Sequence, residues 1–151
     1  MSGIYIHIPF CKQACHYCDF HFSTNLKKKD EMVLALAKEI EMRKSEFQDE
    51  IVETIYFGGG TPSILQIEDL KFLIDAVYKN YKVVENPEIT VEANPDDLTE
   101  TRIIELSKNK VNRLSIGIQS FFEDDLLLMN RAHNVEEAKK CLEIATHYFD
   151  N

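Results

Sequence analysis

Four short apolar runs alternate along the chain with longer segments in which apolar residues recur at helical spacing. The runs have the length and the β-branched content of strands: IYIHI (4–8), ETIYF (53–57), EITVEAN (88–94) and RLSIGIQS (113–120). Helical spacing covers 30–47, 66–80, 99–109, 121–129 and 135–149. Alternation of strands and helices is typical of βαβ units, so we expect an α/β fold with about four parallel βα units.

The strands also separate into an apolar and a polar face, because successive side chains of a strand point to opposite sides. The apolar face contains Ile4, Ile6, Ile8, Ile55, Phe57, Ile89, Val91, Ala93, Leu114, Ile116 and Ile118. The polar face contains Tyr5, His7, Thr54, Tyr56, Thr90, Glu92, Asn94, Ser115, Gly117 and Gln119. We expect the apolar face to pack against the helices. The polar face then lines the lumen of a barrel-like sheet and encloses a polar ligand, because side chains alone do not readily fill such a lumen.

Composition and charge fit one globular domain and exclude two classes of function. The chain has 151 residues, of which 44% are hydrophobic, and a formal net charge of −9. Phosphate contacts need clustered Lys and Arg, so we expect no nucleic-acid binding. No apolar run approaches the roughly 18 residues of a membrane-spanning helix, and the N-terminal MSGIYIHIPF does not have the pattern of a signal peptide. We therefore expect a cytoplasmic protein that does not span the membrane, with peripheral membrane contact left open.

Three cysteines, Cys11, Cys15 and Cys18, lie close together in the segment FCKQACHYCDF, just after the first predicted strand. Loops at the carboxyl ends of parallel strands build the active sites of α/β barrels. Cysteines of a cytosolic protein stay reduced, which favours a metal-binding or catalytic role over disulfides. Thiolates prefer iron–sulfur clusters, zinc or copper(I) as metal partners.

The number of cysteines helps to distinguish between these partners. A structural zinc ion needs a fourth ligand, which His16 or His21 could supply, and a simple electron-transfer cluster uses four cysteines. The remaining cysteine, Cys141, falls in the helical segment AKKCLEIA, where we expect a small buried apolar side chain. Three ligands on a four-iron cube leave one iron with an open coordination site. Such a site indicates metal chemistry.

The spacing CxxxCxxC, with the aromatic Tyr17 just before the third cysteine, resembles the signature of the radical S-adenosylmethionine (SAM) superfamily. The resemblance implies a 4Fe-4S cluster held by Cys11, Cys15 and Cys18, whose open iron is chelated by the amine and carboxylate of SAM. Reduction of the cluster then cleaves SAM to methionine and a 5′-deoxyadenosyl radical, while the protein supplies position and electrostatics. The implied fold is the N-terminal part of a partial (β/α) barrel.

The glycine-rich segment GGGTP follows the second predicted strand. Glycines let a backbone approach a ligand closely and leave its N–H groups free to bind a carboxylate. A glycine turn without a ligand is the alternative. The resemblance assigns Gly59, Gly60 and Thr61 of this segment to the methionine end of SAM.

Five further residues match positions that contact the cofactor in the superfamily. The resemblance assigns Glu92 to the ribose hydroxyls and Arg131 to the methionine carboxylate, and it implies cofactor contacts for Tyr5, Tyr17 and Gln119. Glu92 lies on the polar face of the third strand, and Gln119 is expected to close the fourth strand on the same face. The alternatives are a buried ion pair for Glu92 and a solvated helix position for Arg131.

Five segments together resemble the oxygen-independent coproporphyrinogen oxidase group: IYIHIPFCKQACHYCDF, FGGGTPS, EANP, RLSIGIQSF and LMNRAHN. The true coproporphyrinogen dehydrogenases carry a further cysteine two residues after the third, where this chain has Phe20. In this respect the chain resembles the radical SAM heme chaperones of the HemW type, which bind heme and deliver it to respiratory haemoproteins. The resemblance implies heme, a recipient haemoprotein and an electron donor for the cluster as partners.

Two other functions stay open, a coproporphyrinogen III dehydrogenase and a zinc-binding or ferredoxin-like module. The resemblance also concerns the extent of the chain. Residues 1–151 are interpreted as a radical SAM core domain that stops before a fifth strand, without the C-terminal domain of the family.

Overall fold

The computed structural model describes residues 2–47 and 50–151. Within them, four strands form one sheet in the order β1-β2-β3-β4, and all neighbouring pairs are parallel. The strands are β1 (Ser2–Ile8), β2 (Val52–Gly59), β3 (Val83–Ala93) and β4 (Arg113–Ile116). The α/β fold with four parallel strands is confirmed.

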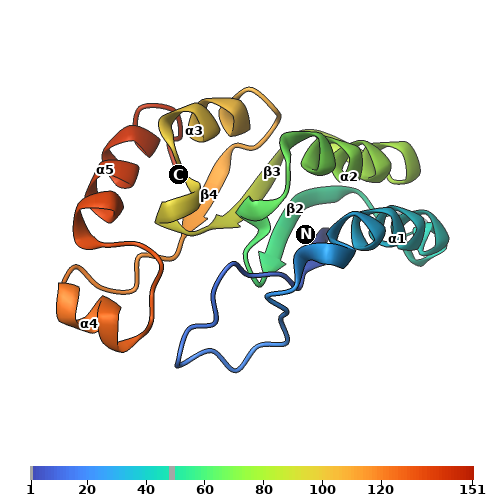
Figure 1. Cartoon of the computed structure of the whole chain (residues 1–151). Helices are drawn as coiled ribbons and strands as arrows, with labels where there is room; N and C mark the ends of the chain where they lie inside the picture. Colours follow the sequence, from blue (N-terminus) through green and yellow to red (C-terminus); the bar gives the residue numbers. More distant parts are fainter. Residues whose placement is uncertain (1, 48–49) are drawn as a thin grey trace.

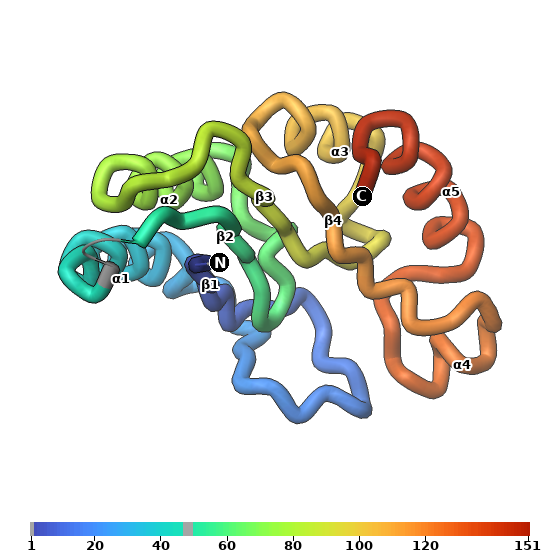
Figure 2. The backbone as a smooth tube through the Cα atoms, turned by 180° about the vertical axis from the view of Figure 1, so that it is seen from behind, coloured from blue at the N-terminus to red at the C-terminus, as the bar shows by residue number. Residues whose placement is uncertain are grey.

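Five α-helices connect and follow the strands in the described part of the chain: α1 (Lys29–Met42), α2 (Ile67–Asn80), α3 (Glu100–Ser107), α4 (Glu123–Leu128) and α5 (Val135–Ala145). The first predicted helix ends earlier than expected, and a separate 3₁₀ helix covers Lys44–Phe47. Figure 1 shows α1 and α2 beside one half of the sheet and α3 and α5 beside the other half. The loop that carries the three cysteines (residues 9–25, the cysteine loop) and α4 lie at one edge of this arrangement, which Figure 2 shows from behind.

The alternation along the strands places the apolar face against the helices, as expected. Ile55 and Phe57 of β2 are fully buried, and so are Leu70, Leu73 and Val77 of α2. These side chains belong to one hydrophobic core that also includes residues of α1, α3 and α5. The sheet therefore buries one face and leaves the other available for a site.

Strand β4 is shorter than the predicted strand 113–120, and Gln119 does not belong to it. Gln119 has a φ of 69°, and the Ser120 N–H donates to the Ile118 carbonyl at 2.9 Å. This bond between residues i and i+2 closes a tight turn around Gln119. A residue with positive φ does not continue a strand. The prediction that Gln119 closes the strand is wrong, because a turn carries it instead.

The carboxyl ends of all four strands meet at the edge where the cysteine loop lies (Figure 1). This follows from the parallel pairing, because parallel strands end at the same side of a sheet. Within the described part of the chain, no helix has the length and apolar character needed to cross a membrane.

Candidate functional site

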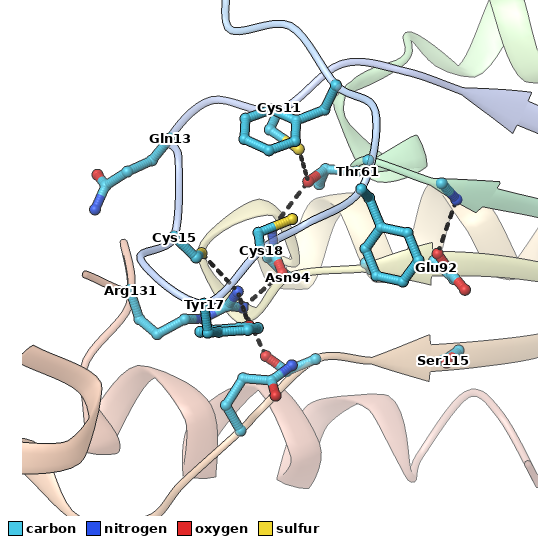
Figure 3. Close-up of a pocket in the computed structure, with 17 residues that line it drawn as sticks. Cys11, Gln13, Cys15, Tyr17, Cys18, Thr61, Glu92, Asn94, Ser115 and Arg131 are labelled. Carbon is cyan, nitrogen blue, oxygen red and sulfur yellow. Dashed lines mark hydrogen bonds between the residues drawn. The ribbon is translucent and has the colours of Figure 1, made fainter. Parts of the chain in front are cut away.

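A cavity of about 360 Å³ opens at the carboxyl edge of the sheet. It is lined by Cys11, Gln13, Cys15, Tyr17, Cys18, Phe20, Phe22, Gly59, Gly60, Thr61, Glu92, Ala93, Asn94, Ser115, Gly117, Gln119 and Arg131. These residues come from the cysteine loop, the ends of β2, β3 and β4, and the connection before α5 (Figure 3). The fold thus brings together every predicted site residue except Tyr5.

The cysteine loop is closed at its base by backbone hydrogen bonds. The Cys11 N–H donates to the Ser23 carbonyl at 3.1 Å, and the Ser23 N–H donates to the Pro9 carbonyl at 2.9 Å. The Thr61 N–H donates to the Phe10 carbonyl at 2.7 Å, which joins the loop to the end of β2. The first cysteine is therefore fixed next to the glycine-rich segment.

The tip of the cysteine loop is held by a distant segment, and we name this contact the clasp (Gln13, His16 and residues 128–130). Gln13 Nε2 donates to the Asn130 backbone carbonyl at 2.7 Å and to Asn130 Oδ1 at 3.0 Å, and Asn130 Nδ2 donates to the Ala14 carbonyl at 2.8 Å. The His16 N–H donates to the Met129 carbonyl at 3.1 Å. The clasp places Arg131, the next residue, beside the cysteines.

The glycine-rich segment lies close to the His7 ring and to the Phe10 backbone. Gly59 has a φ of 113°, a conformation that favours glycine, and a Cβ there would lie 2.6 Å from the His7 ring. A Cβ on Gly60 would lie 2.6 Å from the Phe10 carbonyl oxygen, which is backbone and cannot turn aside. Gly60 is thus required where the end of β2 passes the start of the cysteine loop.

We expect Gly60→Ala to destabilise the protein by about 2 kcal/mol, within the range for overpacked sites. The added methyl group would separate Gly60 from the Phe10 backbone and weaken the bond from the Gly60 N–H to the Ile8 carbonyl, which is 2.9 Å long. The midpoint of urea unfolding measures the effect. Gly58→Ala is the matched control, because its Cβ meets the rings of Tyr5 and Tyr56 and the exposed Tyr5 ring can move. Equal midpoints for the two variants would contradict the steric argument.

Glu92 projects into the cavity from the end of β3. Its two carboxylate oxygens accept hydrogen bonds from the Tyr56 hydroxyl at 2.7 Å and from the Gly59 N–H at 3.1 Å. Among the described residues it takes part in no ion pair, so the alternative of a buried ion pair is not what the structure has. The strand register sets Ser115 beside Glu92, which adds a hydroxyl that the sequence interpretation did not assign.

Arg131 lies in the connection between α4 and α5 and is part of neither helix. Its Nη1 donates to Cys15 Sγ at 3.3 Å and to the Tyr17 hydroxyl at 3.2 Å. Its Nη2 donates to Asn94 Oδ1 at 2.6 Å and to the Gly117 carbonyl at 2.7 Å (Figure 3). The guanidinium therefore faces the cavity, and the alternative of a solvated helix arginine is wrong.

The three cysteines are free thiols. Burial raises the pKa of the Cys11 thiol, while the hydrogen bond from Thr61 and the charge of Arg131 lower it. Burial also raises the pKa of Tyr17, an effect that the charge of Arg131 opposes. A bound metal deprotonates a thiol outright, so Cys11, Cys15 and Cys18 can serve as thiolate ligands.

Several residues with candidate chemistry do not reach this cavity. Tyr5 is 57% exposed and lines a second cavity between β1 and α1, where its hydroxyl lies 3.1 Å from His7 Nδ1. Cys141 is buried in the hydrophobic core, and burial raises its pKa to about 11. His133 is buried and its Nε2 lies 3.0 Å from the Ile118 carbonyl, next to the turn of Gln119.

The donor set fits an iron–sulfur cluster. Three cysteine sulfurs line one cavity together with a glycine backbone, and each cysteine of a cluster binds its own iron atom. Among the residues that the structure describes, no three His, Cys, Asp or Glu side chains converge on a single metal position. Cys11, Cys15 and Cys18 would hold the cluster, and the cavity beyond them would hold its ligand.

A profile of the Radical SAM superfamily matches residues 5–151. The chain belongs to this superfamily. Membership implies a 4Fe-4S cluster and SAM as cofactors, in agreement with the resemblance carried by the cysteine spacing.

Two curated relatives are named heme chaperone HemW. The chain is 39% identical to the one of Escherichia coli over 147 residues and 40% identical to the one of Bacillus subtilis over 139 residues. These matches cover 95% and 91% of this chain but 39% and 37% of the relatives, so the chain spans about two fifths of their length.

The chain also resembles a solved structure over nearly its whole length. Coproporphyrinogen III oxidase (HemN) from E. coli, described as a radical SAM enzyme, superposes with a TM-score of 0.87 at 29% identity. The match covers 97% of this chain and 34% of that protein. The four-stranded sheet therefore corresponds to part of a radical SAM barrel.

Proposed function

We propose that the chain binds a 4Fe-4S cluster and SAM and belongs to a heme chaperone that delivers heme to haemoproteins. The observation that carries the proposal is the single cavity in which the three loop cysteines meet Glu92 and Arg131. These residues come from separate elements and have no reason to converge in a simple electron-transfer module. The bound cluster supplies one electron to the sulfonium of SAM when it is reduced.

The residues of the chain would bind and orient the two cofactors. Cys11, Cys15 and Cys18 hold the cluster, and the glycine-rich segment borders the methionine end of SAM. The N–H groups of Gly59, Gly60 and Thr61 already donate to Glu92, Ile8 and Phe10, so the segment contributes close backbone approach and not free N–H donors. Arg131 is the cation and Glu92 the carboxylate among the described lining residues, so they pair with the methionine carboxylate and the ribose hydroxyls. Tyr17 and Gln119 line the rest of the SAM cavity. Tyr5 lies in the neighbouring cavity on the same face of the sheet, so it would contact the cofactor only from there.

The heme chaperone branch is supported by the HemW relatives and by Phe20. Phe20 lines the cavity and is 72% exposed, and it stands where the dehydrogenases have a fourth cysteine. A phenyl ring offers neither a thiol nor a metal ligand. The second candidate is a coproporphyrinogen III dehydrogenase, which the likeness to HemN favours.

We further propose that residues 1–151 are the core domain of a longer cytoplasmic protein. The relatives extend well beyond the region of similarity. Heme, a recipient haemoprotein and an electron donor for the cluster would be the partners of that protein.

An anaerobic assay on the full-length protein that contains this chain tests the proposed function. We expect heme to bind, to remain intact and to leave when an apo-haemoprotein is added. We also expect no protoporphyrinogen from coproporphyrinogen in the presence of SAM and reductant. Turnover of coproporphyrinogen would overturn the chaperone assignment in favour of the dehydrogenase, and Phe20→Cys is the variant that tests the role of this position.

A further inference from the structure

A continuous chain of side-chain hydrogen bonds connects two of the three cysteines through Asn94. Thr61 Oγ1 donates to Cys11 Sγ at 3.5 Å, and Asn94 Nδ2 donates to Thr61 Oγ1 at 3.2 Å. On the other side, Arg131 donates from Nη2 to Asn94 Oδ1 at 2.6 Å and from Nη1 to Cys15 Sγ at 3.3 Å. Figure 3 shows these hydrogen bonds as dashed lines that run from Cys11 past Thr61 and Asn94 to Arg131 and Cys15.

The direction of the chain is fixed by chemistry. The guanidinium of Arg131 can only donate, so the oxygen of the Asn94 amide must face it. The amide nitrogen then faces Thr61 and occupies a lone pair of its hydroxyl, which leaves the hydroxyl proton for Cys11 Sγ. Both ends of the chain therefore donate a hydrogen bond to a cysteine sulfur.

The surroundings keep Asn94 in this orientation. Thr61 is only 4% exposed, so its hydroxyl has little access to water as a competing partner. Gly117 lies against the amide, where an added Cβ would be 3.3 Å from Asn94 Oδ1 and 3.5 Å from Arg131 Nη2. The pocket around Asn94 thus leaves room for a planar side chain of this size with one acceptor and one donor end.

We propose that Asn94 is a positioning residue that directs these two donors to the cluster cysteines and so raises the reduction potential of the cluster. The inference rests on the proposed function, because it requires the cluster. Reduction adds negative charge that spreads onto the cysteine sulfurs, and a hydrogen bond to a sulfur stabilises that charge. The role of Asn94 is to orient Thr61 and Arg131, without contact to the cluster itself.

The substitution Asn94→Asp tests the inference with almost no change of shape. A carboxylate has no donor for Thr61, so the Thr61 hydroxyl turns to donate to it and Cys11 Sγ loses its hydrogen bond. We expect a more negative reduction potential, measured by titration of the reconstituted protein with electron paramagnetic resonance detection in the absence of SAM. A tenfold change in the ratio of oxidised to reduced cluster corresponds to about 59 mV for one electron.

The added charge of the aspartate also lowers the potential, and a double-mutant cycle with Thr61→Val separates the two effects. Thr61→Val removes the donor to Cys11. This substitution alone should lower the reduction potential enough to change the ratio of oxidised to reduced cluster about tenfold. In the Thr61→Val background, Asn94→Asp retains only its charge effect, so we expect a smaller shift than in the wild-type background. Thr61→Ser keeps the hydroxyl, so its reduction potential should equal that of the wild-type protein.

Equal shifts of Asn94→Asp in the two backgrounds, or a wild-type potential in Thr61→Val, would overturn the inference while leaving the proposed function intact. If Asn94→Asp does not assemble a cluster, the comparison of Thr61→Val with Thr61→Ser decides alone. Failure of the wild-type protein to assemble any cluster would instead overturn the proposed function and the inference together.

Discussion

Replacing Cys15 with alanine is expected to abolish the iron–sulfur cluster, whereas Cys141→Ala should leave the iron content unchanged. Cys15 lines the cavity and accepts a hydrogen bond from Arg131, so its loss removes one of three thiolate ligands. Cys141 is 2% exposed and packs in the core at the other side of the sheet. Truncating it should cost about 1 kcal/mol of stability without affecting the site.

Anaerobic reconstitution with iron and sulfide, followed by iron determination, measures this difference. The wild-type and Cys141→Ala proteins should contain about four iron atoms per chain, the content of one 4Fe-4S cluster. Electron paramagnetic resonance spectra should change when SAM is added to the reduced protein. Loss of iron in Cys141→Ala would make Cys141 a ligand. Stoichiometric zinc without any iron–sulfur absorption would favour the zinc-binding module.

The two faces of the sheet could be predicted from the sequence because the period of two residues reports burial directly. Ile55 and Phe57 alternate with polar residues and are fully buried in the structure. Glu92 follows the same rule on the opposite face and lies in the cavity. Local motifs such as the cysteine spacing and the glycine-rich segment could be recognised because neighbours in sequence stay neighbours in space.

The alternation along a strand shows on which face of the sheet a side chain lies, but not how far it lies from the carboxyl ends of the strands. Tyr5 illustrates the difference. Tyr5 lies three residues before the end of β1, which corresponds to about 10 Å of strand. Glu92 lies one residue before the end of β3 and therefore reaches the cavity at the carboxyl edge. The sequence placed both residues on one face, and the structure separates them into two cavities.

The remaining features depend on tertiary contacts that no local pattern reports. Gln13 and Asn130 are 117 residues apart, and their hydrogen bonds exist only because the α4–α5 connection folds back onto the cysteine loop. Gln119 has a φ of 69°, which is uncommon for a residue other than glycine, and Asn130 has a φ of 55°, which asparagine adopts more readily than most residues. Gln119 lines the cavity, and Asn130 holds the cysteine loop in the clasp.

Replacing Glu92 with glutamine should weaken SAM binding by about 1.5–3 kcal/mol, the value of a hydrogen bond to a charged group. The carboxylate can accept from both ribose hydroxyls while it holds the Tyr56 hydroxyl and the Gly59 N–H. An amide of the same shape loses the charge and one acceptor. The free energy of unfolding should change by about 1 kcal/mol or less, because the shape of the side chain is kept.

Calorimetric titration of the cluster-loaded protein with SAM measures the change in affinity, and urea unfolding measures the change in stability. Glu88→Gln is the matched control, since Glu88 lies on the same strand and face but is exposed outside the cavity. We expect wild-type affinity for this control. Unchanged SAM affinity in Glu92→Gln, combined with a large loss of stability, would instead make Glu92 a structural residue that fixes Tyr56 and the end of β2, because the carboxylate would then serve the fold and not the cofactor.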